Sequence, residues 1–492
     1  MALSVSLPAF RISDNTDIKY TETTMEDATF PFLSSDIARY QVSPLMGWTN
    51  KPIQEEDKEV QIPKAPQQEN GPSIIKPTIS QFSGVHTDET LARVIASYVD
   101  TLPHLKDHFL GYPINQDFYY EALLKLMCFR LNNVGDPFIG STYMLNSNQF
   151  ELCVLDWFAE LWEIEENEYW GYVTNGGTEG NLYAILVGRE LYPDGILYTS
   201  KESHYSLFKV ARIARVKCVV VGTRPSGEID YDELKASLLA HKDKPAIINL
   251  NLGTTMKGGI DDLDVVLQVL ENCGFTEDRF YIHCDAALFG VMLPFINKAP
   301  KISFKKPIGS VTVSGHKFLG CPIPCCVLMT RLNYVDVLSQ EVEYLTSRDT
   351  TISGSRGGHT SIFLWYALNK RGFNGLQQDV SECVEKAIYL HNRLRDHGIG
   401  VMLNKFSNIV VFERPLDNTF ARRWILADKG NLSHVVVLQH VTMEMLDLFV
   451  TEFVENRSIW YQDNNGGKKP PCIAEDIGAK NCACSFHKKL IS

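Results

Sequence analysis

Residues 308–320 read IGSVTVSGHKFLG and join a β-branched run to a lysine. The valine and threonine side chains between Gly309 and Gly315 are typical of a buried β-strand. Lys317 follows this strand and precedes FLGCPIPCC, an apolar segment at 318–326. Because an ammonium group loses much hydration free energy in such surroundings, a lysine at this place indicates chemistry rather than a solvated surface charge.

Strand and helix patterns alternate on the N-terminal side of this stretch. Short β-branched runs predict strands, and apolar residues at helical spacing separate them. Such alternation needs crossover connections, so we predict an α/β fold with a mainly parallel central sheet covered on both faces. The predicted strands are 169–175, 195–200, 217–223, 246–253, 280–287 and 308–315, and the predicted helices are 151–164, 178–192, 206–216, 231–242 and 263–274.

Composition divides the chain into four parts. Residues 1–85 are rich in Pro, Gln, Glu and Lys without an apolar period, which predicts a disordered or partner-wrapping arm. Residues 86–372 are expected to form the large α/β domain, whose first helix has Thr87 or Asp88 as its cap. A smaller α+β domain is expected at 373–462, followed by a C-terminal tail at 463–492. The smaller domain is predicted as helix 376–398, strands 407–415 and 432–440, and helix 442–458.

The overall composition excludes several classes of protein. A net charge of −12 argues against nucleic-acid binding driven by phosphate neutralisation, and no 18-residue apolar window predicts a membrane span. The N-terminus lacks the basic region of a secretory signal and the arginines of a transit peptide. The 12 cysteines are irregularly spaced, and because the N-terminus shows no export signal we expect them to be reduced thiols. We therefore expect a cytoplasmic enzyme that binds neither nucleic acid nor membrane.

Two further segments end predicted strands at the same edge as Lys317. In VTNGGTEGN, residues 173–181, a strand gives way to a helix near Gly177 and Thr178, whose free N–H groups could bind a phosphate. The plainer interpretation is a tight turn with a helix cap. In FYIHCDAALFG, Asp285 ends an apolar strand, either as a turn cap or as a carboxylate facing the ligand crevice.

Together these features match the needs of pyridoxal phosphate. Its aldehyde needs a lysine, its ring nitrogen needs a carboxylate and its phosphate needs a helix N-terminus, which Lys317, Asp285 and the Gly177 turn would supply. His204, in SKESHYSLFK, adds an imidazole that could stack on the ring or move protons. Taken alone, His204 would be interpreted as an ordinary loop residue.

From about residue 100 onward, the chain resembles the plant branch of the group II pyridoxal-phosphate decarboxylases, which includes serine and histidine decarboxylases. The resemblance covers nearly four-fifths of the chain. It rests on LGYPINQDF (110–118), GDPF (135–138), VLDWFAELWEIE (154–165), YWGYVTNGGTEGNL (169–182), PDGILYTSKESHYS (193–206), GEIDYDEL (227–234), YIHCDAALFG (281–290), KPIGSVTVSGHKFLGCPIPC (306–325) and VEYLTSRDTTISGSR (342–356).

The resemblance implies a role for each candidate residue. Lys317 would form the Schiff base with the cofactor, and Asp285 would pair with the pyridine nitrogen. Ala287 and His204 would lie against the two ring faces, and the phosphate would be surrounded by Gly177, Thr178, Ser314 and His316. The implied molecule is a fold-type I homodimer with shared active sites, in which Tyr344 reaches the neighbouring site as the acid that reprotonates the product. Relatives with phenylalanine there tend toward aldehydes, so Tyr344 favours amine formation.

The substrate stays open between serine, histidine and an aliphatic L-amino acid. Ile114 stands where the serine and alanine decarboxylases of this branch carry an aromatic residue, a tyrosine in the serine enzymes. An isoleucine offers apolar surface and no hydroxyl. Cys326 also departs from the pattern, where glycine is usual. A catalytically altered relative with a binding or assembly role is the alternative from another class, and an aminotransferase or another lyase is the alternative among enzymes.

The tail carries a second constellation. Cys472, Cys482, Cys484 and His487 lie within 16 residues, and four such ligands suit a tetrahedral structural zinc. Similar tails in the plant branch, some of them zinc-binding, favour this interpretation. The alternative is a frayed tail with reduced thiols.

Overall fold

The computed structural model describes residues 86–461 and 469–487, and the expected arm at 1–85 lies outside them. The main element is a seven-stranded sheet in the order β2-β8-β7-β6-β5-β3-β4. Only β8 runs against its neighbours, so the predicted α/β class with a mainly parallel sheet is confirmed. The strands are β2 (Tyr169–Thr174), β3 (Ile196–Ser200), β4 (Lys217–Val221), β5 (Ala246–Asn251), β6 (Phe280–Asp285), β7 (Ser310–Ser314) and β8 (Cys326–Arg331).

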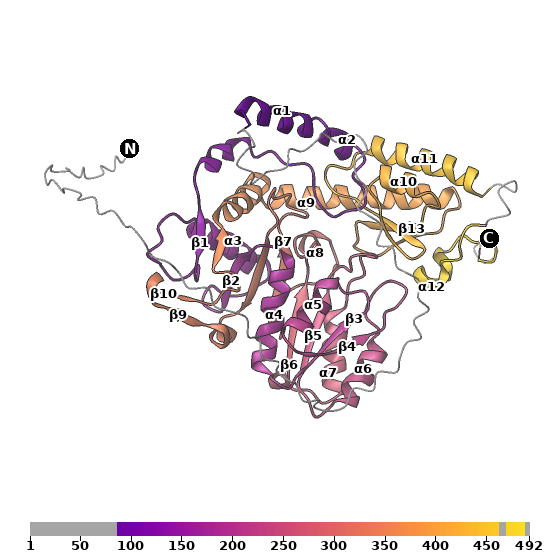
Figure 1. Cartoon of the computed structure of the whole chain (residues 1–492). Coiled ribbons are helices and arrows are strands. Elements are labelled where there is room, and N and C mark those ends of the chain that lie inside the picture. Colours follow the sequence, from indigo (N-terminus) through magenta and orange to yellow (C-terminus); the bar gives the residue numbers. More distant parts are fainter. Residues whose placement is uncertain (1–85, 462–468, 488–492) are drawn as a thin grey trace, which may run out of the picture. The chain divides into compact units, whose positions relative to one another are not determined.

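Helices cover both faces of this sheet (Figure 1). Consecutive strand residues therefore enter opposite cores: Tyr172 packs with residues of α4 and α5, and Val173 belongs to the core that includes residues of α3, α6 and α7. Asp230 and Asp262 cap α6 and α7 by accepting hydrogen bonds from backbone N–H groups of the first turn. These helices are α3 (Asn148–Leu161), α4 (Gly177–Leu191), α5 (Tyr205–Ile213), α6 (Tyr231–Ala240), α7 (Leu263–Asn272) and α8 (Phe289–Met292).

A second sheet, antiparallel and four-stranded, follows in the order β12-β13-β15-β14. The sequence predicted its two long strands but not β12 and β14, which are three residues long and show no alternation. The preceding helix, α9, begins at Gly358 rather than near 376, and Gly372 interrupts it with φ 59°. The elements are α9 (Gly358–Asp396), β12 (Val401–Leu403), β13 (Ile409–Glu413), α10 (Asn418–Arg423), β14 (Ala427–Lys429), β15 (Leu432–Val436), α11 (Met443–Trp460) and α12 (Ala474–Ile477).

The N-terminal helices lie on the surface. The side chain of Thr87 caps α1 by accepting a hydrogen bond from the N–H of Thr90, which confirms one of the two expected caps. No helix within 86–461 or 469–487 is long and apolar enough to cross a membrane. The remaining elements are α1 (Asp88–Val99), α2 (Leu102–Lys106), β1 (Asn132–Val134), β9 (Gln340–Val342), β10 (Ser347–Asp349), β11 (Ser355–Gly357), and the 3-10 helices η1 (Glu121–Cys128), η2 (Glu277–Arg279), η3 (Leu293–Phe295), η4 (Leu332–Leu338), η5 (Glu343–Leu345) and η6 (Ala479–Asn481).

Candidate active site

Four of the predicted residues meet at the carboxyl edge of the parallel strands. Lys317 follows β7, Asp285 ends β6, Ala287 follows β6 and His204 follows β3. All four line one cavity, where ligands of α/β sheets are expected to bind. The other lining residues are Pro113, Asn251, Gly253, Thr254, Thr255, Leu288, Phe289, Ile409 and Val436.

Lys317 is held by its main chain and has a side chain without an ion-pair partner among the described residues. Its carbonyl accepts a hydrogen bond from the N–H of Asn115 at 3.1 Å, and Asn115 Nδ2 donates to the carbonyl of Phe318 at 3.2 Å. Burial lowers the pKa of Lys317, and the carboxylate of Asp285 acts in the opposite direction. A lowered pKa makes more of the neutral amine available for attack on a carbonyl carbon.

Asp285 is buried and hydrogen-bonded by Asn181, a residue of α4. Asn181 Nδ2 donates to Asp285 Oδ2 at 3.0 Å. The Oδ1 atom of Asn181 lies 3.1 Å from both His283 Nε2 and Thr312 Oγ1. A buried polar network thus lies behind the carboxylate and fixes the position of its oxygens.

His204 caps α5, and its ring is fixed by Ser206. The N–H of Ser206 approaches His204 Nδ1 at 3.3 Å, and Ser206 Oγ lies 2.7 Å from the same atom. Because a backbone N–H can only donate, Nδ1 is the acceptor and the ring proton is on Nε2. Burial is the main cause that lowers the pKa of His204, so the neutral imidazole is favoured.

The N-terminus of α4 is where the sequence predicts an anion site. Gly176 precedes it with φ 145°, a conformation that favours glycine, and no side chain caps the helix. The N–H groups of Gly177 and Thr178 have no backbone or side-chain acceptor within the described ranges. A Cβ placed on Gly177 would lie 3.1 Å from Ser314 Oγ, so Ser314 borders this helix start. His316, in contrast, directs Nδ1 at the carbonyl of Cys325, 3.0 Å away.

One turn further along α4, Gly180 allows the helix to lie close to the sheet. A Cβ at this position would lie 2.8 Å from Thr312 Cγ2 and 3.0 Å from Cys326 Sγ. Such distances are shorter than ordinary carbon contacts, so α4 could not keep its place with a larger residue at 180. The start of α4 and Asn181 therefore reach the site only because position 180 has no side chain.

The cavity lining does not include Gly177, Thr178, Ser314 or His316, and two further predicted site residues, Tyr344 and Ile114, also lie outside it. Tyr344 is 83% exposed and lies in η5, between β9 and β10. Ile114 is 38% exposed, and its neighbour Pro113 lines the cavity in its place.

Three polar lining residues were not predicted from the sequence. Asn251 ends β5, and Thr254 and Thr255 follow it, at the same sheet edge as Asp285. The rule that placed Asp285 there would have placed these residues as well.

The four predicted tail ligands also come together. The candidate ligand atoms of Cys472, Cys482, Cys484 and His487 all lie within 4.8 Å of one another. Cys484 Sγ is 3.1 Å from His487 Nδ1, and hydrogen bonding to this histidine lowers the pKa of Cys484 to about 6. A thiolate is the form of cysteine that binds metals.

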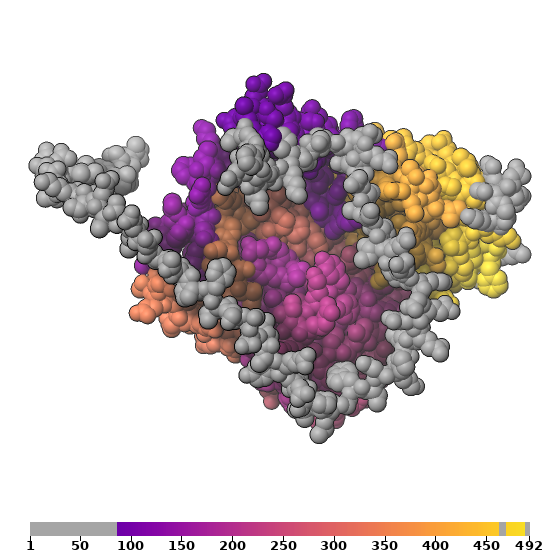
Figure 2. Space-filling model, viewed as in Figure 1, coloured from indigo at the N-terminus to yellow at the C-terminus, as the bar shows by residue number. Residues whose placement is uncertain are grey.

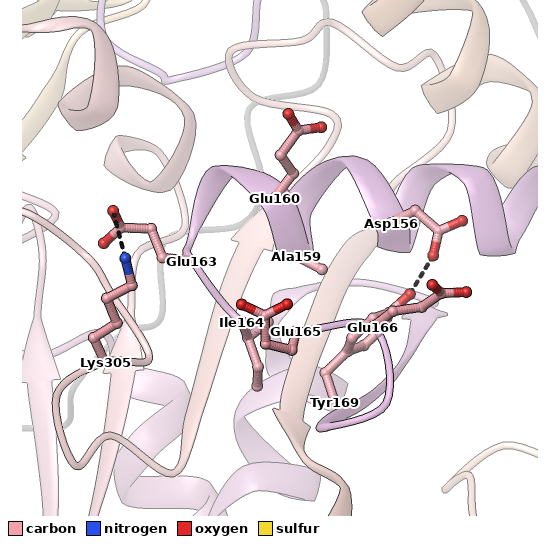
Figure 3. Close-up of a pocket in the computed structure, with 9 residues that line it drawn as sticks. All are labelled: Asp156, Ala159, Glu160, Glu163, Ile164, Glu165, Glu166, Tyr169 and Lys305. Carbon is pink, nitrogen blue, oxygen red and sulfur yellow. Dashed lines mark hydrogen bonds and ion pairs between the residues drawn. The ribbon is translucent and has the colours of Figure 1, made fainter.

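A larger surface hollow of about 540 Å³ lies elsewhere, beside the C-terminal end of α3 (Figure 3). Its lining is mostly acidic; Asp156 accepts a hydrogen bond from Tyr169, and Glu163 lies 3.6 Å from Lys305. It contains no lysine at a strand end. Size therefore does not locate the chemistry, and the smaller cavity at Lys317 is the candidate active site.

Comparison with known proteins agrees with this geometry. The pyridoxal-dependent decarboxylase conserved domain matches residues 144–413. The chain belongs to this family. Serine decarboxylase 1 of Oryza sativa subsp. japonica is 59% identical over 402 residues, which are 82% of this chain and 83% of that protein. Histidine decarboxylase of Solanum lycopersicum is 53% identical over 403 residues, which are 81% of this chain and 97% of that protein.

Solved structures of decarboxylases have the same fold as this chain. L-Methionine decarboxylase from Streptomyces sp. 590 superposes with a TM-score of 0.70 at 26% identity, over 75% of this chain and 95% of that one. The protein is thus a pyridoxal-phosphate-dependent amino acid decarboxylase of the branch that contains the plant serine and histidine enzymes.

The cavity has the donor set that this cofactor requires. Its lining has a lysine without an ion pair and a buried carboxylate fixed by a hydrogen bond from Asn181 of α4, and the same helix begins with two N–H groups lacking acceptors within the described ranges. In a core without a ligand, burial of the lysine and the carboxylate would cost free energy, and the two N–H groups would remain without acceptors. The residues present therefore fit pyridoxal phosphate.

Proposed function

We propose that this decarboxylase converts L-serine or L-histidine into carbon dioxide and the corresponding primary amine. The observation that supports the reaction is the convergence of Lys317, Asp285 and His204 on one cavity. The substrate class is supported by the names of the relatives that are 59% and 53% identical. The test is to incubate the purified protein with each of the twenty amino acids and to measure amine and carbon dioxide. Keto acid without carbon dioxide would indicate an aminotransferase instead.

The roles of the cavity residues follow from their positions. Pyridoxal phosphate, when bound, supplies the electron sink on which loss of the carboxylate depends. Lys317 would hold its aldehyde carbon, Asp285 its ring nitrogen, and Ala287 and His204 its ring faces. The start of α4, at Gly177 and Thr178, would bind the phosphate together with Ser314 and His316. Neutral His204 holds its proton on Nε2, where it can donate a hydrogen bond inside the cavity.

Tyr344 is proposed to act in the active site of a second subunit. It is largely exposed on its own chain, as expected for a residue that becomes buried in a dimer. The N-terminal helices add apolar surface: no residue of α1 or η1 is buried, and this region lies on the outside of the molecule (Figure 2). Exposed apolar area of this extent is typical of an interface. Its large members include Leu91, Ile95, Tyr98, Val99, Leu124 and Met127.

Replacing Tyr344 with phenylalanine tests the proposed acid. The variant keeps the ring but loses the hydroxyl proton, so we expect less amine and, with dissolved dioxygen as the oxidant, more aldehyde, ammonia and hydrogen peroxide, by about tenfold in the product ratio. Products are measured by chromatography and a peroxide assay. Tyr143→Phe, at another exposed tyrosine, is the control. An unchanged ratio would remove Tyr344 from the acid role, and sedimentation of the wild type would test the dimer separately.

An aliphatic substrate is the second candidate, because Ile114 and the lining residues Pro113, Ile409 and Val436 offer apolar surface. Ile114→Tyr should then raise kcat/KM for serine relative to leucine or methionine by about tenfold. Ile459→Tyr, at an exposed isoleucine of α11, is the matched control. An unaltered substrate profile would place specificity elsewhere.

We further propose that the tail cysteines and His487 bind one structural zinc. Tetrahedral zinc with bonds of about 2.3 Å to sulfur separates its ligands by roughly 3.8 Å, close to the distances found here. Cys472 Sγ lies 4.0 Å from Cys482 Sγ and 3.7 Å from His487 Nδ1. Four protein ligands would leave no open position for catalysis, so the metal would be structural.

The tail is joined to the body at several points. Ile473 and Ile477 are buried in the main core. The Nζ of Lys257 donates to the carbonyl of Asp476 at 2.6 Å, and Lys257 is on the loop that carries Thr254 and Thr255. Zinc would thus hold the tail against the cofactor-binding part of the chain.

A cytoplasmic location is proposed from the cysteines, because all 12 are free thiols.

A further inference from the structure

The most densely bonded buried side chain at the site is Asn181, which no assigned role explains. It is 3% exposed and lies on α4, one turn after the helix start that would bind phosphate. Four polar partners lie within hydrogen-bond distance of its amide: Asp285, Ser206, His283 and Thr312. An amide group has two hydrogens to donate and one oxygen with two lone pairs, so all its capacity is used.

The direction of each bond can be worked out from Asp285. An ionised carboxylate only accepts, so the nitrogen of the Asn181 amide must face it and the oxygen must face His283. His283 therefore donates from Nε2. Burial lowers the pKa of His283 to about 4, so its ring is neutral and Nδ1 must accept. The group available to donate there is the hydroxyl of Ser310, at 2.8 Å, which in turn accepts from Tyr281 at 2.7 Å.

The second hydrogen of the Asn181 amide leads to the other side of the cavity. Asn181 Nδ2 donates to Ser206 Oγ at 3.2 Å, and this hydroxyl then donates to His204 Nδ1 at 2.7 Å. One amide group thus holds the carboxylate assigned to the ring nitrogen and, through Ser206, the imidazole assigned to the ring face. No other described residue is hydrogen-bonded to Asp285 through a side chain.

We infer that Asn181 is a positioning residue for the cofactor: it keeps Asp285 as an oriented acceptor toward the ring nitrogen and orients the Ser206 hydroxyl that donates to His204 Nδ1. This inference rests on the role proposed for Asp285. A buried chain of hydrogen bonds runs from Tyr281 through Ser310, His283 and Asn181 to Asp285. Each of these residues donates to the next, so the last bond is a donation to the carboxylate. Without Asn181 the Asp285 oxygens would be free to turn and would lose one charge-assisted hydrogen bond.

The experiment compares two ligands of the apoenzyme: pyridoxal phosphate and its analogue in which a C–H group replaces the ring nitrogen. Binding is measured by fluorescence quenching, so no turnover is needed. Asn181→Ala should raise the Kd for pyridoxal phosphate about tenfold and leave the Kd for the analogue within twofold. Asn133→Ala is the matched control, because Asn133 is equally buried and also donates to a carboxylate, Glu151, outside the cavity. It should not change the ratio of the two Kd values.

Equal weakening of both ligands by Asn181→Ala, or weakening of neither, would overturn the inference. Asp285→Asn separates it from the proposed function: this variant should also lose selectivity for the ring nitrogen. If Asp285→Asn weakens binding of pyridoxal phosphate more than binding of the analogue and Asn181→Ala does not, only the inference fails. If neither variant does so, the role of Asp285 fails first. Should Asn181→Ala not fold, Thr312→Val removes one donor to Oδ1 and should raise the same ratio about threefold; no change would overturn the inference.

Discussion

The cavity at Lys317 and the cysteine cluster of the tail are built in opposite ways. The cavity residues come from strand ends far apart in the sequence, and the buried network behind them includes Asn181, His283 and Ser310. The tail cluster takes all its ligands from residues 472–487, and this segment has no core of its own: its buried side chains, such as Ile473, Ile477 and Cys482, pack into the main core.

The difference predicts which of the two sites needs its ligand to keep its geometry. The cavity is fixed by the same core that stabilises the sheet, so it should keep its geometry when the cofactor leaves. A short segment without a core of its own gains most of its order from the metal, whose binding free energy is then folding free energy. The two regions should therefore respond differently to loss of a side chain, to acid and to chelation.

The largest effect is expected for Lys317→Ala. We expect turnover to fall by roughly 10⁴-fold or more, because no other described lysine lines the cavity. The melting temperature of the apo form should stay the same or rise, since a desolvated ammonium group is removed. Activity is measured by amine release and stability by calorimetry. Turnover within tenfold of wild type would contradict the mechanism, and a wild type without cofactor absorbance would favour the binding or assembly alternative.

The next effect concerns acid and the network behind Asp285. Burial holds the pKa of His283 at about 4 in the folded state, below its ordinary value of 6.5. A lowered pKa means that the stabilisation is present above pH 6.5 and is lost as the pH falls toward 4. Between pH 7 and pH 4 the wild type should lose up to about 3 kcal/mol more unfolding free energy than His283→Gln.

Urea titrations at several pH values measure this difference, and His241→Gln, a histidine near the surface, is the control. Equal pH dependence of the wild type and His283→Gln would mean that His283 is not held neutral in the core.

The smallest effect on global stability is expected in the tail. The double variant Cys482→Ser, Cys484→Ser should lose close to one zinc per chain, and protease cleavage within 469–487 should accelerate about tenfold. The melting temperature of the body should change by only a few degrees. Metal analysis and limited proteolysis measure these outcomes, with Cys128→Ser, Cys153→Ser as the matched control at exposed thiols. Zinc-free wild type with a protease-resistant tail would show that the cluster orders itself.

The sequence predicted the sheet and most of the cavity because both follow from local patterns. Lys317 and Asp285 could be placed at one edge because each ends a β-branched run, and the carboxyl ends of parallel strands meet. Asn181 could not be found in this way, because its importance comes from partners 25 to 131 residues away. The early start of α9 was missed because Gly372 and its neighbours suggest the end of a helix. In the structure the helix continues on both sides of Gly372, which is its one non-helical residue.

The close contact of Gly180 with Cys326 limits how this protein can evolve. Residue 180 has no room for a methyl group while residue 326 carries a thiol and Thr312 stays in place. A lineage in which position 326 becomes glycine and Thr312 also loses its methyl group would gain space there, and a small side chain at 180 could then be tolerated. Substitution in the reverse order would pass through an intermediate in which α4 moves away from the sheet and displaces Asn181. The order in which changes at positions 312, 326 and 180 are accepted is therefore constrained by geometry, before selection for any substrate applies.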